Sequence, residues 1–171
     1  MAATLPSAAE LFATKGAAAT SIREIASHAG VNHGLVFRYF GTKDKLLGAT
    51  LDYLADRTAE TLKSGASLAD TRLAMDRQLR VAVRAVLDGY PLAKLQTRFP
   101  GVDVFLDQIR PGFPDDDTAR LAAAHAIVLN IGWRLFGTTL TDIIGLDNLT
   151  VERLNDSIET QINRITNRDP H

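Results

Sequence analysis

The residues best suited to chemistry stand together in one short stretch, "NHGLVFRYF", which covers residues 32–40. Asn32 and His33 offer hydrogen-bond donors and acceptors, and Gly34 lets another molecule approach the backbone closely. The stretch contains no catalytic triad, no phosphate-binding glycine loop and no set of metal ligands. Its residue types therefore predict recognition through hydrogen bonds and apolar contacts, with no bond-making step.

The rest of the chain adds no catalytic constellation. An enzyme would need a nucleophile with its base, paired carboxylates in a cleft or a metal set. None of the four histidines has the spacing of metal ligands; they are His28, His33, His125 and His171. The acidic run at residues 115–117 is typical of the negatively charged first turn of a helix. We therefore predict a protein that is not an enzyme, holds no metal and uses no cofactor.

The composition is that of a globular protein. The chain has 171 residues, 46% hydrophobic and 23% charged, which suffices for one sizeable core or two small ones. No apolar run reaches the length of a membrane span, and the opening residues lack the pattern of a signal peptide. The absence of cysteine fits a cytoplasmic protein. A net charge of −1 argues against bulk coating of nucleic acid but permits a local basic face.

The spacing of the apolar residues predicts an all-α fold. No window alternates apolar and polar residues as a half-buried strand would. Ser21 stands three residues before Glu24, the spacing of a capping box, and Thr42 precedes the longest early helix. Four prolines between residues 91 and 114 limit the helices of that segment. The expected helices are residues 8–15, 21–29, 32–40, 42–62, 68–89, 102–109, 117–140 and 150–165.

The second and third helices have the pattern of a helix-turn-helix. Two helices that cross closely need a small residue at the crossing, which Ala26 supplies. The turn needs a residue that tolerates positive φ four positions later, which Gly30 supplies. Apolar residues on both helices can pin the pair together: Ile22, Ile25, Ala29, Val31, Val36 and Tyr39. The first residues of the following helix, which include Asn32, are then left to face a partner.

At this point the sequence resembles the TetR family of transcriptional regulators. The matching string is "AAELFATKGAAATSIREIASHAGVNHGLVFRYFGTKDKLLGATL", from Ala8 to Leu51, about the first third of the chain. The resemblance implies an all-α protein with a three-helix helix-turn-helix DNA-binding domain over residues 1–47. It implies a helical effector-binding and dimerisation domain over residues 48–171. Two other interpretations stay open: a helical protein-interaction module that binds no DNA, and a small helical enzyme.

The family resemblance also implies a function. Such a protein binds a palindromic or pseudopalindromic operator in double-stranded DNA as a homodimer, most often as a repressor. A small molecule, here of lipophilic type, binds the helical domain. It releases the DNA by favouring another spacing of the two DNA-binding domains in the dimer. No membrane partner is expected.

The resemblance places the DNA contacts at the starts of the helices. The helix that opens at Asn32 enters the major groove, and residues near its start reach base edges. Asn32 either reads a base or caps the helix, and Gly34 either permits close approach or simply starts the helix. Lys43 contacts a phosphate or is an ordinary exposed lysine, and Tyr39 contacts the backbone or packs. The predicted DNA-binding residues are Thr20, Ser21, Asn32, His33, Gly34, Leu35, Arg38, Tyr39 and Lys43.

Two departures from the family pattern predict modest DNA binding with a shallow salt dependence. Phe37 stands where the family often has tyrosine, so a hydroxyl that could bond a phosphate is missing. The opening residues carry no Lys or Arg, whereas many members have a basic arm there. Residues 1–50 contain five cationic side chains against three anionic ones, a margin of two. Neutralisation of phosphates supplies much of a protein's affinity for DNA.

The later helices are expected to bind the effector and the second subunit. The predicted effector-binding residues are Tyr90, Phe99, Phe105, His125 and Trp133. These would make an aromatic, mostly apolar pocket, although His125 taken alone is better explained as a hydrogen-bonded core histidine. The apolar positions of the helix over residues 68–89 fall on one stripe at helical spacing: Met75, Leu79, Ala82, Val83, Val86 and Tyr90. The last two long helices are the predicted dimer contact, because small residues and an isoleucine face allow close packing.

Overall fold

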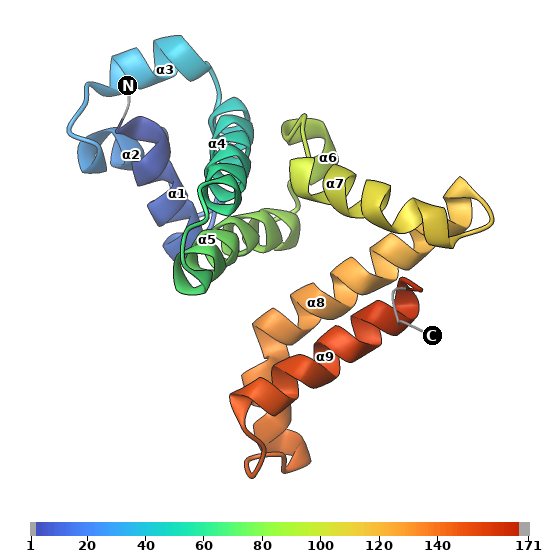
Figure 1. The fold of residues 1–171 in the computed structure, drawn as a ribbon. Helices are drawn as coiled ribbons and strands as arrows, with labels where there is room; N and C mark the ends of the chain where they lie inside the picture. The colour runs from blue at the N-terminus through green and yellow to red at the C-terminus, as the bar shows by residue number, and fades with distance from the viewer. Residues whose placement is uncertain (1–2, 168–171) are drawn as a thin grey trace. The chain divides into compact units, whose positions relative to one another are not determined.

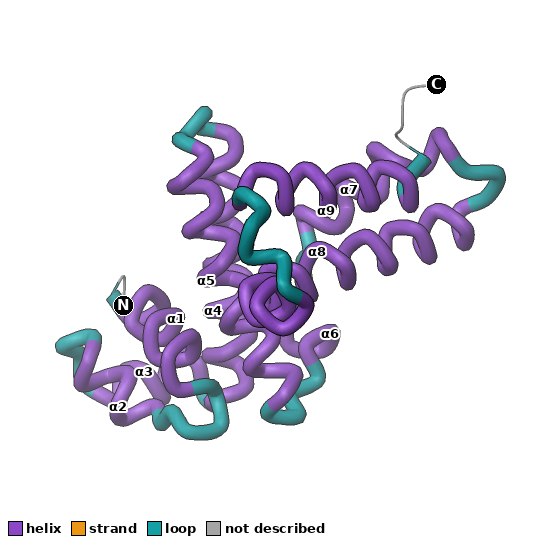
Figure 2. Tube along the Cα trace, turned by 90° about the horizontal axis from the view of Figure 1, so that it is seen from below, coloured by secondary structure: helices purple, strands orange, loops and turns teal. Residues whose placement is uncertain are grey.

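The computed structural model describes residues 3–167, and within that range it contains helices, turns and loops but no strand (Figure 2). The predicted all-α class is therefore confirmed. The described chain forms two compact units, the first ending at Pro100 and the second beginning at Gly101. None of the described helices is both long and apolar enough to cross a membrane.

The first unit gathers six helices around one core (Figure 1). α1 packs against both α4 and α5, and α2 and α3 form a contacting pair beside them. The bounds are α1 (Thr4–Lys15), α2 (Ile22–His28), α3 (His33–Phe40), α4 (Lys43–Lys63), α5 (Leu68–Leu87) and α6 (Leu92–Leu95). The fully buried large side chains of this core are Phe12, Ile25, Val36, Leu46, Leu47, Leu51 and Val81. Since α4 shares this core with α1, the packing boundary differs from the predicted functional boundary at residue 47, which stays a prediction.

The helix starts predicted from the sequence are confirmed by their side-chain caps. Ser21 Oγ accepts from the Glu24 N–H at 3.1 Å, and Thr42 Oγ1 accepts from the Lys45 N–H at 3.2 Å. These bonds satisfy amide groups that a helix start leaves without partners. The Glu24 carboxylate also pairs with Lys15 of α1. That pairing ties α2 to α1.

The turn between α2 and α3 has the geometry that the sequence predicts. Gly30 has φ of 64°, a conformation that glycine adopts without strain. Its N–H donates to the Ser27 carbonyl at 3.1 Å, and the Val31 N–H donates to the Ala26 carbonyl at 2.9 Å. These two bonds make the Schellman ending of a helix. Ala26 is buried at the crossing of the two helices, as expected.

The buried face of α5 differs from the predicted stripe. Val81 and Ala85 are buried, whereas Met75 is 40% and Val86 is 54% exposed. Ala82 and Tyr90 of the stripe do pack against the core, but Val81 and Ala85 are the residues buried in it, because the neighbouring helices α1 and α4 determine the buried face. Apolar spacing on α5 fits more than one face, and the small Ala85 permits the closer packing.

The second unit is an α8–α9 hairpin with short elements before it. α7 (Pro100–Ile109) and the 3-10 turn η1 (Arg110–Gly112) precede α8 (Asp116–Ile144), and α9 (Val151–Ile165) runs back alongside α8 (Figure 1). Its small core consists of Leu106, Ile109, Ala119, Ala122 and Ala123. The prolines were expected to divide residues 91–114 into short helical pieces, and this is confirmed because α6, α7 and η1 are all short.

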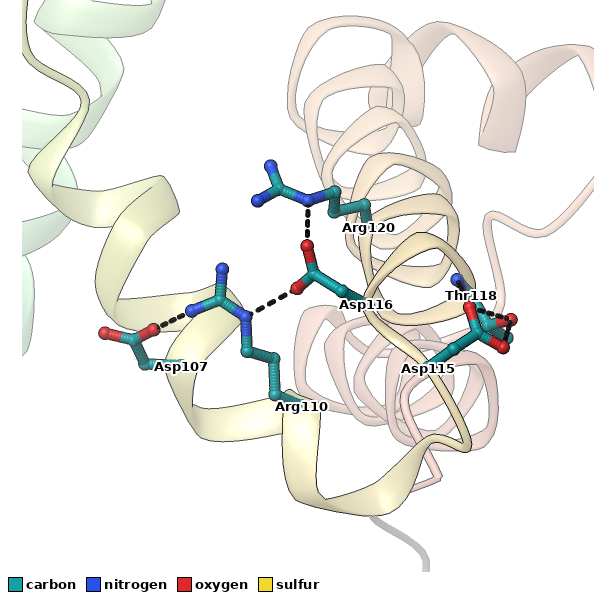
Figure 3. A network of polar contacts seen from close by, with 6 residues as sticks. All are labelled: Asp107, Arg110, Asp115, Asp116, Thr118 and Arg120. Carbon is teal, nitrogen blue, oxygen red and sulfur yellow. Dashed lines mark hydrogen bonds and ion pairs between the residues drawn. The ribbon is translucent and has the colours of Figure 1, made fainter.

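The start of α8 is fixed by an exposed charge cluster (Figure 3). Arg110 pairs with Asp107 and donates from Nε to Asp116 at 2.8 Å, while Arg120 Nε donates to the same Asp116 carboxylate at 2.5 Å. Asp115 caps the helix by accepting from the Thr118 N–H at 2.8 Å. The prediction that this acidic run forms the first turn of a helix is therefore confirmed.

The same cluster predicts a stability that depends on pH. Hydrogen bonds from Arg120 and Arg110 lower the pKa of Asp116, and the Thr118 backbone N–H lowers the pKa of Asp115. A folded-state pKa below the unfolded value stabilises the fold above the unfolded pKa, and this contribution is lost as pH falls through the folded pKa.

We therefore expect Asp116→Asn to lower the melting temperature at pH 7, and the difference from wild type to shrink as pH falls through the folded-state pKa of Asp116. Melting temperatures measured from pH 2 to 8 check this. Asp147→Asn, which removes an exposed carboxylate in the α8–α9 turn, is the matched control. Equal pH profiles for the two variants would contradict the assignment.

Candidate nucleic-acid interface

A hollow of about 670 Å³ lies between the start of α2, the start of α3 and the first residue of α4. Five of the nine predicted DNA-binding residues line it: Thr20, Ser21, His33, Gly34 and Lys43. These residues come from three separate helix starts, so only the crossing of α2 and α3 brings them together. The hollow is open to solvent on its outer side, as a contact surface for a large partner must be.

The outward face of α3 adjoins this hollow. Val36 is fully buried and Phe40 is 9% exposed, so these two side chains hold α3 against the core. Leu35 is 55% exposed, and Tyr39 is 71% exposed. The sequence favours packing for Tyr39, and that prediction is wrong: the ring meets Phe40 edge-on at 4.8 Å between centroids, but most of it is exposed. An exposed apolar and aromatic helix face indicates a surface made for a partner.

Asn32 has the capping role that the sequence left open. Its Oδ1 accepts from the Gly34 N–H at 2.8 Å, so the amide oxygen is already engaged. The side-chain N–H₂ group of this exposed residue keeps its donors for a partner. A Cβ at Gly34 would stand 3.1 Å from that oxygen, which explains why glycine suits the position.

Lys43 is more than an exposed lysine. It is half-buried, and its Nζ donates to the Ala17 carbonyl at 2.8 Å and to the Ala18 carbonyl at 3.3 Å. The same ammonium lies 5.9 Å from the centre of the Tyr90 ring. An ammonium has three N–H donors, so one remains for an anion at the rim of the hollow.

Thr20 has a structural role that sequence reasoning did not foresee. Its side chain is 1% exposed, and its hydroxyl donates to the Gly16 carbonyl at 2.7 Å. The hydroxyl proton of Thr20 is therefore engaged within the protein. Ser21, the next residue, is exposed and stands at the rim.

Five residues outside the predicted set also line the hollow: Ala18, Ala19, Ile22, Arg23 and Phe37. The signal for Arg23 was its place two positions after the Ser21 cap, where a side chain stays close to the helix start. Phe37 is 59% exposed, so its ring lies where a tyrosine hydroxyl would have reached solvent. Lys15, by contrast, is neutralised by Glu24, whose pKa is lowered by that contact.

The predicted effector-binding residues divide between the two units. Tyr90 and Phe99 belong to the first unit and Phe105, His125 and Trp133 to the second. His125 is exposed, so the alternative of a buried core histidine is wrong. Tyr90 packs against the core of the first unit. Phe105 packs against the core of the second unit.

Among residues 3–167, no cluster of three or more His, Cys, Asp or Glu side chains could hold a metal ion. His171 lies outside the described residues.

Known proteins are similar to this chain in sequence and in fold. Residues 5–50 match the sequence profile of the bacterial regulatory proteins of the tetR family. The chain is 50% identical over 170 residues to the HTH-type transcriptional repressor Rv3405c of Mycobacterium tuberculosis strain H37Rv, covering 99% of this chain and 89% of that protein. The HTH-type transcriptional regulator Mb3439c of Mycobacterium bovis gives the same identity and coverage. A crystal structure assigned to a tetR family transcription regulator from Shewanella sp. PV-4 has the same fold, with a TM-score of 0.57 over 94% of both chains at 18% identity. The chain belongs to the TetR family of helix-turn-helix transcriptional regulators, and is a DNA-binding regulator rather than an enzyme.

Proposed function

We propose that this regulator binds its operator by placing α3 in the major groove, with the hollow against the adjoining DNA backbone. An α-helix fits the major groove, and residues at its start reach base edges. The observation that carries the proposal is the meeting of Ser21, His33 and Lys43 around one hollow, beside an exposed α3 face. Groups that can hydrogen-bond to bases and a cation that can bind a phosphate therefore lie next to each other on one surface.

His33 and Leu35 are the proposed base readers. Asn32 would need both its oxygen and its nitrogen to pair with adenine, and its oxygen already accepts from Gly34. His33 is exposed and can donate or accept, while the exposed Leu35 suits the methyl group of thymine. Gly34 leaves room for close approach of the backbone.

Ser21, Lys43 and the flanking Arg38 and Tyr39 are the proposed phosphate contacts. Lys43 keeps one N–H donor beyond its two carbonyl bonds, and Arg38 and Tyr39 are exposed beside the base-reading face. Thr20 contributes through the fold of the loop, because its hydroxyl is bonded internally. Lys15 is paired with Glu24, so it is not among the proposed phosphate contacts.

Replacing Lys43 by methionine is expected to weaken operator binding and to flatten its salt dependence. The slope of log K against log salt concentration becomes shallower by about 0.9 for each lysine that neutralises a phosphate. Fluorescence anisotropy with a labelled operator between 50 and 300 mM salt, roughly the range over which such slopes are read, measures it. Lys63→Met, at the opposite end of α4, is the matched control and should keep the wild-type slope. An unchanged slope for Lys43→Met would exclude it as a phosphate contact.

A homodimer formed through α8 and α9 is the proposed assembly. None of the residues of α9 is fully buried, and its partly buried Leu154, Ile158 and Ile162 leave apolar surface available. Further apolar side chains of α8 and α9 are strongly exposed: Leu121, Val128, Phe136, Ile143, Ile144 and Val151. Burying such surface against a second copy stabilises a dimer. A dimer reads two half-sites, which accounts for the expected palindromic operator.

A small lipophilic effector that releases the DNA completes the proposal. The proposed effector contacts are Tyr90 and Phe99 in the first unit, and Phe105, His125 and Trp133 in the second; each set is proposed by itself. Residues 1–47 would read DNA, and residues 48–171 would bind the effector and the second subunit. The name of the Mycobacterium tuberculosis relative supports repression as the outcome. Since its target is the bacterial chromosome, the proposed location is the cytoplasm.

A mobility-shift experiment tests the function directly. Purified protein is mixed with DNA fragments that carry inverted repeats beside its own coding gene, and with the same fragments after the repeats are scrambled. We expect a shift of an intact repeat that is lost on scrambling. A folded dimer that shifts none of these fragments would count against the proposal.

A further inference from the structure

The loop between α1 and α2 forms one wall of the hollow. Ala18 and Ala19 line the hollow from this loop, and Ser21 follows directly after it. The position of the loop therefore sets where Ser21 and the start of α2 stand. α2 has seven residues, so its own hydrogen bonds do little to hold the loop in place.

Two side chains of opposite charge hold this loop from different directions. The Ala18 N–H donates to Asp88 Oδ2 at 2.8 Å. The Ala17 and Ala18 carbonyls accept from Lys43 Nζ at 2.8 and 3.3 Å. We call these three hydrogen bonds the loop bracket. Bonds with one charged partner are stronger than neutral ones, and these fix both polar edges of the peptide chain at Ala18.

Two features beside Asp88 allow its carboxylate to reach the loop: the lack of a side chain at Gly16 and the hydrogen bond of Arg84. A Cβ at Gly16 would stand 3.1 Å from Asp88 Oδ2, and Gly16 has φ of 87°, so glycine leaves room for the carboxylate. One helical turn before Asp88, the Arg84 guanidinium donates to the Thr14 carbonyl at 2.7 Å. The end of α5 thus contacts both ends of the same short segment. The Tyr90 N–H donates to the Ala85 carbonyl at 2.9 Å, which closes the helix immediately after Asp88.

We propose that Asp88 is a positioning residue for operator binding: its carboxylate, 70 residues away in sequence, holds the α1–α2 loop in the position in which Ser21 and Lys43 meet the DNA backbone. This proposal rests on the proposed function. An acidic side chain beside a phosphate would by charge alone repel DNA. Asp88 therefore has two effects of opposite sign, and substitutions can separate them.

The experiment compares Asp88→Ala, Asp88→Asn and Glu60→Ala in the full chain. Asparagine removes the charge and keeps an oxygen that can accept from Ala18, whereas alanine removes both. Glu60→Ala removes an exposed carboxylate near the far end of α4 and controls for net charge. Operator affinity is measured on a duplex selected from a random library, and amide hydrogen exchange of residues 16–21 is measured on the free protein.

We expect Asp88→Ala to weaken binding by roughly two- to tenfold, the range that the net contribution of a typical intramolecular hydrogen bond implies. Exchange of the Ala18 amide should become faster. Asp88→Asn should bind as tightly as wild type or more tightly, because it keeps the acceptor and removes the repulsion. A role confined to stability would lower the melting temperature of Asp88→Ala and leave the affinity of its folded fraction unchanged.

That outcome would overturn the proposal, and so would three further results. Tighter binding by Asp88→Ala and Asp88→Asn alike would show that charge alone acts. Unchanged exchange at Ala18 in Asp88→Ala would show that the loop bracket does not hold the loop. A wild-type protein that selects no duplex would overturn the proposed function and the positioning role with it. Because exchange is read without DNA, the second result is distinguishable from the third.

Discussion

Replacing Phe12 by alanine is expected to lower the free energy of unfolding by about 3–5 kcal/mol, the usual range for a buried phenylalanine. Phe12 is fully buried in the core shared by α1, α4 and α5. Its removal leaves a cavity that the neighbouring helices cannot fill without moving. Domains of this size have a total stability of roughly 5–15 kcal/mol, so the first unit would lose much of its free energy of unfolding.

Urea unfolding monitored by circular dichroism measures this loss. Phe37→Ala is a matched control, since it makes the same substitution at a side chain that is 59% exposed. We expect Phe37→Ala to change stability by less than about 0.5 kcal/mol, as is common for surface positions. The control should change operator binding instead, because Phe37 lines the hollow. Equal losses of stability in the two variants would contradict the assigned core.

Replacing Gly48 by alanine is expected to destabilise the first unit by about 1–3 kcal/mol, the usual cost of overpacking. A Cβ at this position of α4 would stand 2.3 Å from the Leu95 carbonyl oxygen of α6. Because the obstructing atom belongs to the backbone, no side-chain rotation relieves the contact. The whole α6 segment must move away from α4, and with it the Arg98–Asp56 ion pair at 3.0 Å.

The control for Gly48 is Gly132→Ala, because Gly132 is also within a helix but has nothing within 4 Å of the added carbon. Alanine favours helix over glycine by roughly 1 kcal/mol, so this control should be stabilising. The two substitutions thus differ in sign. Chemical denaturation gives the stabilities, and hydrogen exchange over residues 92–98 reports the displacement of α6. A stabilising Gly48→Ala would show that α6 does not lie as closely on α4.

Local sequence was a sound guide to where the helices begin and end. Ser21, Asn32 and Thr42 cap helices because a hydroxyl or amide oxygen reaches an amide two or three residues ahead. Gly30 ends α2 because few other residues adopt its φ. Such interactions join residues that are close along the chain, so the local sequence is enough to predict them. The breaks between residues 91 and 114 follow from proline in the same way.

The buried face of each helix and the contacts between residues far apart in the sequence were harder to predict. Tyr39 and Phe40 are adjacent and both aromatic, yet the first is exposed and the second buried. On α5, Val81 and Ala85 are buried in preference to Met75 and Val86. In both helices the apolar residues outnumber the positions that the core can cover. Crossing angles and neighbouring helices choose among them, and these are properties of the assembled unit.

The candidate site shows the same division. The sequence by itself determined that a helix-turn-helix lies near the start of the chain, that its second helix begins with Asn32 and His33, and that Lys43 stands at a helix start, because these are matters of local pattern. Only the tertiary structure decided that Thr20 turns inward, that Lys43 holds the Ala17 and Ala18 carbonyls, and that Asp88 reaches the same loop. The physical reason is separation along the chain: contacts across 26 and 70 residues depend on how α1, α4 and α5 pack, which no local pattern encodes.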